Sequence, residues 1–363
     1  NGDCTPTELA QAMDICSFPT GSEKYWGVVS SDFLLADGSG SSSTPCRNQF
    51  GVQSSFAQYY GSGSTNPAVN SRFAVVSSGR ATAAAGGVDD SICSKTRRNN
   101  VPSAYISKHG GNLETANNCP TGSSNVYESA SLRLRIRAPT NAKSFSYRLM
   151  FLSQEFPYYV CTQYNDMFLA LLSSFPAGFP APADTNVATA PIPSGSGTQT
   201  VPLSINIEKF FTICQARNSY GTNCNPTAFS TMLSGSAYRY SRSGQQWGAG
   251  TALLTNTVNV SPGSTFSIDF LIFDTGDYKY QSTAILDSLT WNAEASPSGS
   301  GVSLEDLCPT DPLKTEPLIC GCGVADVDTD GDGVYDCHDG CPTDPSKTTP
   351  GYCGCNSDDS GYF

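Results

Sequence analysis

A run of regularly spaced aspartates near the C-terminal end constrains this chain more than any other feature. Five of them fall at positions 1, 3, 5, 9 and 12 of a twelve-residue segment, and they are Asp328, Asp330, Asp332, Asp336 and Asp339. Gly333 at position 6 permits the sharp turn that brings the carboxylates to one point, and the carbonyl of Val334 at position 7 adds an oxygen. Oxygen ligands without thiolate suit Ca²⁺ better than Zn²⁺, so the sequence predicts Ca²⁺ (Ca2+) as the cofactor.

This segment differs from an EF-hand, because position 12 is Asp and no helix pattern flanks it. A solvated acidic linker is the alternative interpretation, and the regular spacing argues against it. His338 lies between two ligands and is interpreted as a bystander. The D-x-D-x-D-G-x-x-D-x-x-D-x-C pattern, followed by Pro342, resembles the thrombospondin type 3 repeat. That resemblance implies a chain that wraps around calcium and is stapled by disulfides.

The same region contains an internal repeat. Residues 308–322 (CPTDPLKTEPLICGC) return as residues 341–355 (CPTDPSKTTPGYCGC), at an offset of 33 residues, which is a typical period for tandem structural units. Only one full calcium loop is present, so we expect either a degenerate array or a longer chain that continues after Phe363.

Charge is distributed unevenly along the chain. Residues 304–363 carry 13 acidic and 2 basic side chains, whereas residues 1–303 carry 19 and 18. A nucleic-acid partner requires clustered Lys and Arg to neutralise phosphates, so the sequence predicts no nucleic-acid binding. The acidic segment requires cations instead.

Fifteen cysteines predict an exported protein with disulfide bonds. Eight disulfide candidates lie in the N-terminal part: Cys4, Cys16, Cys46, Cys93, Cys119, Cys161, Cys214 and Cys224. Seven lie in the C-terminal part: Cys308, Cys320, Cys322, Cys337, Cys341, Cys353 and Cys355. An odd number predicts a free thiol, a bridge to the other domain or a bond to another chain.

Targeting features agree with export. No apolar run approaches the ~20 residues of a membrane-spanning helix, and the chain begins at Asn1 without a signal peptide. We therefore expect a mature secreted protein, extracellular or on the cell surface, without a membrane span.

The first 293 residues have an all-β pattern. Apolar and polar side chains alternate over 132–137, 145–151 and 266–272, which is the period of a strand with one buried face. Weaker strand candidates are 72–76, 167–172, 201–207 and 285–291. Many short strands joined by Gly/Ser/Pro-rich loops predict a disulfide-rich, jelly-roll-like β-sandwich.

A short N-terminal helix precedes the strands. Thr5 can cap it, Pro6 suits its first position and Glu8 completes a capping box. One face then holds Leu9, Ala12, Met13 and Cys16, and a frayed terminus is the alternative. Cys4 and Cys16 flank the helix and could pin it to the body.

The composition divides the chain into three parts. Residues 294–303 are rich in Gly, Ser and Pro and predict a flexible linker. The β-sandwich over 1–293 precedes this linker, and the calcium-binding repeat tail over 304–363 follows it.

Three motifs stand out in the large domain: residues 153–168 (SQEFPYYVCTQYNDMF), residues 186–188 with 202–206, and residues 273–277 with 285–287. The first is similar to the S-E-E-Y-P-E-(x)n-F-N-D-x-F signature of the choice-of-anchor L family of secreted and surface proteins of bacteria, and the other two resemble later stretches of the same family. The resemblance covers residues 1–293. Gln154 departs from it, because the family prefers a second acid there.

Oxygen ligands in these motifs predict a possible second metal site, formed by Glu155, Asn165, Asp166, Asp274 and Asp277. They lie beside strongly apolar strands, where an unpaired carboxylate is costly, so one interpretation is a calcium ion that pins loops at one edge of the sandwich. The alternative is turn chemistry, with Asx side chains bonding their own backbone.

Two features raise the question of glycan partners. Arg133, Arg135 and Arg137 share one strand face, which could bind anionic polysaccharide or be paired with acids across the sheet. Tyr238 with Tyr240, and Tyr278 with Tyr280, could stack on sugars or serve the fold.

Catalysis is not predicted. The chain has two histidines, and His109 lies in a Lys-His-Gly-Gly loop with no pattern for a triad. Cys-Gly-Cys does not match a zinc array.

The sequence therefore predicts a non-enzymatic, calcium-binding bacterial cell-surface or matrix protein that acts in adhesion or extracellular structure. An extracellular filament subunit and a carbohydrate-binding module are the alternatives, and the expected partners are other copies of the chain, surface or matrix components, or glycans.

Overall fold

The computed structural model describes most of the chain. The described residues are 4–19, 25–39, 49–53, 72–79, 81, 98–116, 119–122, 125–194, 197–207, 210–214, 233, 238, 240–242, 245–297, 299–304, 311, 320–325, 327–351 and 354–357. They form two compact units, residues 1–303 and residues 304–363, called here the sandwich unit and the C-terminal unit.

The predicted N-terminal helix is present as α1 (Pro6–Ala12). Its capping box is complete, because the Thr5 side chain accepts a hydrogen bond from the Glu8 backbone and the Glu8 carboxylate accepts one from Thr5 N–H at 2.7 Å. Leu9, Ala12 and Met13 are buried, as the shared face predicts. Cys16 is exposed, so the prediction was wrong for the last residue of that face.

The first of two antiparallel sheets has the strand order β1-β5-β15-β7-β9-β8, and β4 pairs with β5. Its strands are β1 (Gly27–Leu34), β4 (Arg98–Asn100), β5 (Asn125–Arg137), β7 (Met167–Leu172), β8 (Thr189–Ser194), β9 (Gly197–Ser204) and β15 (Thr265–Thr275). Alternation over 132–137 is confirmed, because the three apolar side chains of this stretch are buried and the three arginines are at least partly exposed.

The second sheet has the order β10-β13-β6-β16-β3-β2, and β14 pairs with both β6 and β17. Its strands are β2 (Phe50–Gln53), β3 (Phe73–Ser77), β6 (Ser144–Ser153), β10 (Ile213–Cys214), β13 (Ala249–Gly250), β14 (Leu254–Asn259), β16 (Ser282–Asn292) and β17 (Gly301–Leu304). Two shorter pieces accompany the sheets: the hairpin β11 (Tyr240–Arg242) with β12 (Gln245–Trp247), and α3 (Ser103–Ile106) running into η2 (Ser107–His109).

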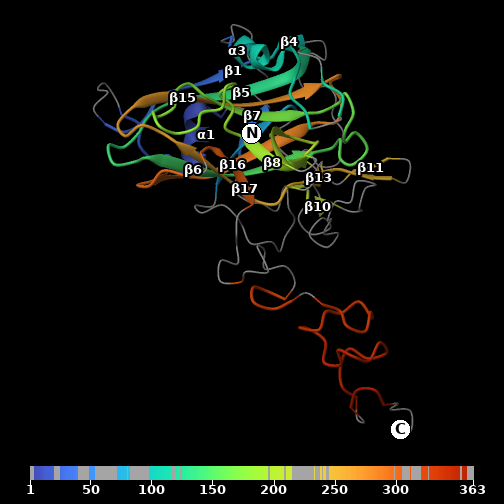
Figure 1. Ribbon diagram of the computed structural model, residues 1–363. Helices are drawn as coiled ribbons and strands as arrows, with labels where there is room; N and C mark the ends of the chain where they lie inside the picture. Colours follow the sequence, from blue (N-terminus) through green and yellow to red (C-terminus); the bar gives the residue numbers. More distant parts are fainter. Residues whose placement is uncertain are drawn as a thin grey trace. The chain divides into compact units, whose positions relative to one another are not determined.

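The strands of the two sheets are shown in Figure 1. Aromatic rings join the two sheets across a common core. The ring of Phe145 on β6 stacks on Phe266 of β15 with centroids 5.5 Å apart, and Tyr147 meets Phe270 edge-on at 5.2 Å. All four side chains are buried. The sandwich-like arrangement therefore follows from inward-facing aromatics on strands of opposite sheets. Among the described residues, no helix has the length and apolar character needed to cross a bilayer.

The segment for which the composition predicts a linker is partly ordered. Asn259 Nδ2 donates to the Ser296 carbonyl at 2.9 Å, and Ser296 N–H donates back to Asn259 Oδ1 at 2.7 Å. Gly301 then begins β17, which pairs with β14. Hydrogen bonding to the sheet edge thus overrides a Gly/Ser/Pro-rich composition.

Three disulfides join described residues, and they are Cys119–Cys161, Cys320–Cys337 and Cys341–Cys355. Cys214 and Cys322 are also disulfide-bonded. The prediction that disulfides of Cys4 and Cys16 pin α1 to the body is wrong. Cys16 is a free thiol, and the Cys4 thiol donates to the Phe50 carbonyl at 3.3 Å. Cys46, Cys93, Cys224, Cys308 and Cys353 lie outside the described residues.

Arg133 forms a salt bridge with an acidic residue on a neighbouring strand of the first sheet. Its guanidinium donates to both oxygens of Asp269, at 2.7 and 2.6 Å, and the two residues are register partners on β5 and β15. This is the pairing predicted by the structural interpretation of the arginine face, and a bidentate pair leaves this side chain little capacity for an anionic sugar.

Gly248 supplies a test of the packing between β12 and β13. Its φ is +93°, and an added Cβ would lie 2.0 Å from the carbonyl oxygen of Tyr238. We expect Gly248→Ala to destabilise the sandwich unit by about 3 kcal/mol or more, measured by urea unfolding. Gly178→Ala is the control, because its φ is +86° with no atom within 4 Å of the added Cβ, and it should cost only about 1 kcal/mol. Equal losses would contradict the packing argument.

Candidate metal centres

The first candidate centre is the aspartate loop, residues 328–339 of the C-terminal unit. Asp328, Asp330 and Asp332 each place a carboxylate oxygen within 4.8 Å of the other two. The first half of the predicted ligand set thus converges on one point.

Backbone hydrogen bonds shape this loop. Asp328 accepts from Gly331 N–H at 2.8 Å and from Gly333 N–H at 3.0 Å, while Asp332 accepts from Val334 N–H at 2.8 Å. Such Asx bonds turn the chain back on itself at each acid. The turns bring together carboxylates that an extended chain would keep apart.

Two carboxylate oxygens of the loop remain buried without a hydrogen-bond partner among the described residues, Asp330 Oδ2 and Asp339 Oδ2. Desolvation, together with the negative charges of Asp332, Asp339 and Asp328, raises the pKa of Asp330. A cation would satisfy these oxygens and offset the repulsion, so the donor set fits a hard divalent ion.

Asp336 is placed differently from the other predicted ligands. Its two oxygens accept from Thr329 N–H at 2.8 Å and Thr329 Oγ1 at 2.6 Å, and these hydrogen bonds lower its pKa. In this arrangement Asp336 clasps the loop, and its role as a ligand stays a prediction, as does that of the Val334 carbonyl.

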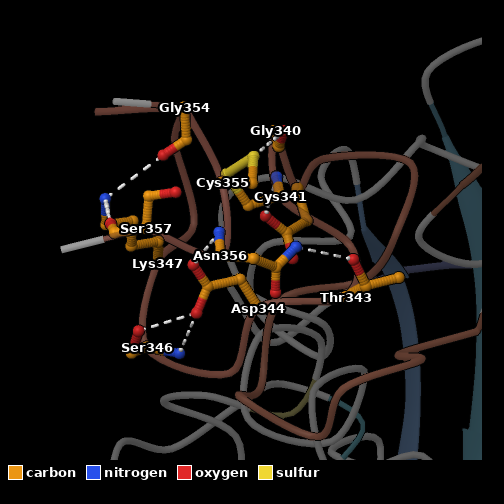
Figure 2. Close-up of a disulfide and its surroundings, with 11 residues drawn as sticks. Gly340, Cys341, Thr343, Asp344, Ser346, Lys347, Gly354, Cys355, Asn356 and Ser357 are labelled. Atoms are coloured by element: carbon orange, nitrogen blue, oxygen red, sulfur yellow. Dashed lines mark hydrogen bonds between the residues drawn. A yellow bond between two sulfur atoms is a disulfide. The ribbon is translucent and has the colours of Figure 1, made fainter. Parts of the chain in front are cut away.

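The second copy of the repeat is held by a disulfide and by side-chain hydrogen bonds (Figure 2). The disulfide Cys341–Cys355 lies beside Asp344, whose carboxylate accepts from Ser346 Oγ at 2.7 Å and from Asn356 N–H at 2.7 Å. These hydrogen bonds lower the pKa of Asp344. Asp344 is therefore a structural clasp in this copy.

The second candidate centre is the buried acidic cluster, formed by Glu155, Asn165, Asp166 and Asp274. These residues belong to the ends of strands in both sheets: Glu155 follows β6, Asn165 and Asp166 precede β7, and Asp274 lies near the end of β15. Each is at most 1% exposed. The fold thus brings predicted residues from the ends of β6, β7 and β15 into buried positions.

Asp166 is held in place by neighbouring strands. Its Oδ1 accepts from Thr275 N–H at 3.1 Å, and its Oδ2 accepts from Ser282 Oγ at 2.8 Å. Thr275 Oγ1 in turn accepts from Asn165 N–H at 2.6 Å. Sequence reasoning missed Thr275 and Ser282, because small hydroxyl residues carry no signal that marks them as supports of a site.

Other polar atoms of the buried acidic cluster lack such supports. No hydrogen-bond partner among the described residues reaches Glu155 Oε2 or either side-chain polar atom of Asn165. Leaving buried polar atoms unsatisfied costs several kcal/mol. The turn-chemistry alternative does not account for them, because they bond no backbone group.

Burial dominates the titration of this cluster. It raises the pKa of Asp166 to about 7. Burial, reinforced by the charge of Asp166, raises the pKa of Glu155 and of Asp274 well above the usual range. Without a cation, the folded protein therefore favours protonated carboxyl groups here.

Asp277 lies at the margin of this centre. It is partly exposed, and its Oδ1 accepts from Lys279 N–H at 2.8 Å. Its charge still contributes to the raised pKa values of Glu155 and Asp166. In the aspartate loop, the donor atoms of Asp328, Asp330 and Asp332 all lie within 4.8 Å of one another. The carboxylates of the buried acidic cluster are less tightly gathered.

A third group of ligand side chains, His109, Glu114 and Asp184, also has donor atoms within 4.8 Å of one another. The sequence analysis did not combine these residues, because 75 positions separate His109 from Asp184 and no motif links them.

Comparison with known protein families identifies the domain. The family model of the choice-of-anchor L domain matches residues 35–292. This segment includes the whole buried acidic cluster and most strands of both sheets. No curated protein and no solved structure matches the chain.

Proposed function

The chain belongs to the choice-of-anchor L family, and from this premise we propose that it is a secreted bacterial cell-surface or matrix protein that binds calcium and acts in adhesion or extracellular structure. Disulfide bonds in both units are typical of exported proteins and support this location. Binding, and not catalysis, is the proposed activity.

The convergence of Asp328, Asp330 and Asp332 carries the calcium proposal. Three carboxylates within 4.8 Å repel one another, and a hard cation with oxygen ligands is the usual way to stabilise such a group. We propose that this loop is a thrombospondin type 3-like repeat, in which calcium and the disulfides together stiffen a stalk.

A second calcium ion is proposed for the buried acidic cluster. The unsatisfied oxygens of Glu155 and Asn165 support it, and the buried carboxylates of Asp166 and Asp274 are further donors. Small side-chain rotations would be needed to close these donors on an ion. The ion would tie the ends of β6, β7 and β15 together in a jelly-roll-like sandwich.

A carbohydrate-binding role has weaker support. Trp247 and Tyr280 stack on each other with ring centroids 5.2 Å apart, and both side chains are buried. Tyr238 is buried and hydrogen-bonded to Thr283. Tyr158 is exposed, and its ring also packs on Trp247, with ring centroids 4.3 Å apart. These rings mainly pack on one another.

Asp328→Asn tests the proposal in the full chain. The substitution removes one charge from the converging group and one of the two backbone hydrogen bonds that Asp328 accepts, so we expect calcium affinity at this centre to fall at least tenfold, about 1.4 kcal/mol. Isothermal titration calorimetry at fixed ionic strength measures it.

Glu294→Gln is the matched control, because it removes one charge from an exposed residue of the sandwich unit. Its calcium binding should equal that of the wild type. Unchanged binding by Asp328→Asn, or equal losses in both variants, would contradict a site at the aspartate loop.

A further inference from the structure

His109, Glu114 and Asp184 form a compact group in the sandwich unit, away from both acidic centres in sequence. His109 ends η2, Glu114 lies in the loop that follows, and Asp184 lies in the loop between β7 and β8. His109 Nε2 is 2.9 Å from Asp184 Oδ2 and 3.9 Å from Glu114 Oε2. One nitrogen and two carboxylate oxygens therefore face a common point.

The surrounding chain holds each of these side chains in place. Asp184 Oδ1 accepts from Asn186 N–H at 3.0 Å, which leaves Oδ2 directed to His109. Next to Glu114, Thr115 is tied to the first sheet, because its carbonyl accepts from Gln199 Nε2 at 3.2 Å and its hydroxyl accepts from Asn206 Nδ2 at 2.9 Å. Donor groups fixed by such supporting contacts are preorganised for a ligand.

A buried hydroxyl lies at the same place. The Tyr105 side chain is 1% exposed, and its ring lies against the His109 ring with centroids 4.8 Å apart. Its hydroxyl has no hydrogen-bond partner among the described residues. A buried hydroxyl without a partner thus belongs to a ring that packs directly on the His109 imidazole.

We infer that His109, Glu114 and Asp184 bind a first-row transition-metal dication of the Zn²⁺ class. Ligand atoms about 2.1 Å from a tetrahedral zinc ion lie about 3.4 Å apart, and the two distances from His109 Nε2, 2.9 and 3.9 Å, bracket that value. A water molecule on the open fourth position could accept the hydrogen bond of Tyr105 Oη. The group would then have three protein ligands and one exchangeable site.

The donor chemistry separates this centre from the two acidic ones. An imidazole nitrogen favours Zn²⁺ and related ions over Ca²⁺, which prefers oxygen alone. The competing explanation is a metal-free His109–Asp184 hydrogen bond with Glu114 nearby. This inference uses none of the residues proposed for calcium, so either proposal can fail while the other stands.

Zinc binding by the full chain tests the inference. Millimolar Ca²⁺ is kept in excess to occupy the acidic centres, and Zn²⁺ is titrated in competition with a chromophoric chelator. His109→Gln and Glu114→Gln are compared with His338→Gln, which changes the chain's other histidine. We expect one Zn²⁺ per chain in the wild type and in His338→Gln, and at least a tenfold loss of affinity in the other two variants.

Thermal unfolding supplies a second readout. Zn²⁺ should raise the melting temperature of the wild type and of His338→Gln, but not that of His109→Gln or Glu114→Gln. Melting temperatures without metal are compared first, because they show whether either variant has a folding defect. If one variant is defective, the other still tests the inference. Absence of zinc binding in the wild type, or equal binding in all variants, would overturn the inference.

Discussion

Chelation of calcium is expected to convert residues 304–363 into a protease-sensitive chain while the sandwich unit stays folded. Among the described residues of the C-terminal unit, Cys341 is the only apolar side chain that is fully buried, and Val324 and Val327 are exposed. A unit without an apolar core depends on disulfides and bound ions for its order. Its 13 acidic side chains repel one another once the cation is removed.

Limited proteolysis with mass spectrometry, in calcium and in chelator, measures this effect. Hydrogen exchange on the same samples should show the largest loss of protection in the C-terminal unit. The disulfides Cys320–Cys337 and Cys341–Cys355 keep the segments linked, so cleavage should become visible after reduction. A tail that resists protease equally with and without chelator would contradict calcium-dependent order.

The second large effect is a reversal in how the stability of the sandwich unit depends on pH. In chelator, the raised pKa of Asp166, about 7, means that the folded state binds protons more tightly than the unfolded state. The stabilisation is present below the unfolded value near 4 and is lost as the pH rises through about 7. We expect the melting temperature in chelator to fall by on the order of 5 °C between pH 5 and pH 8.

Calcium should reverse this trend, because the ion requires ionised carboxylates and competes with protons. The loaded protein is therefore expected to be more stable at pH 8 than at pH 5. Scanning calorimetry in buffers of equal ionic strength measures both slopes. The same slope with calcium and with chelator would contradict an ion in the buried acidic cluster.

Asp274→Asn isolates the cluster. The substitution replaces a buried carboxylate with a neutral amide of the same shape, so it removes the charge and keeps the packing. It should stabilise the calcium-free protein at pH 8 and abolish the calcium response of the sandwich unit. Asp287→Asn is the control: burial and the Asp14 charge raise the pKa of Asp287 to about 7 as well. This variant should flatten the slope in chelator and retain the calcium response.

Local sequence signals predicted the elements of the fold well. Alternation over 132–137 predicts part of β5, the capping box at Thr5 predicts α1, and the apolar run 167–172 coincides with β7. Each signal depends on neighbours within a few residues, where burial period and capping chemistry decide the outcome. The pairing order of the strands depends on long-range contacts and could not be predicted in this way.

Whether a candidate site could be predicted also depended on how close its residues lie in the sequence. The aspartate loop is local, so spacing alone predicted the convergence of Asp328, Asp330 and Asp332. The buried acidic cluster was predicted through family motifs that bring distant strand ends together. His109 and Asp184 lie on separate loops without a motif, and only the folded chain brings them together. Asp336 shows that spacing alone can mislead. Its place in the sequence pattern is that of a calcium ligand, but both of its carboxylate oxygens accept hydrogen bonds from Thr329.

Calcium titration by calorimetry, combined with sedimentation velocity on the same samples, tests the central claim most directly. A calcium-stiffened surface protein should bind calcium tightly, lose one class of sites in Asp328→Asn, and sediment as a monomer with and without chelator. Growth into large species with calcium would favour the filament alternative over a monomeric stalk. The absence of calcium binding would contradict the claim itself.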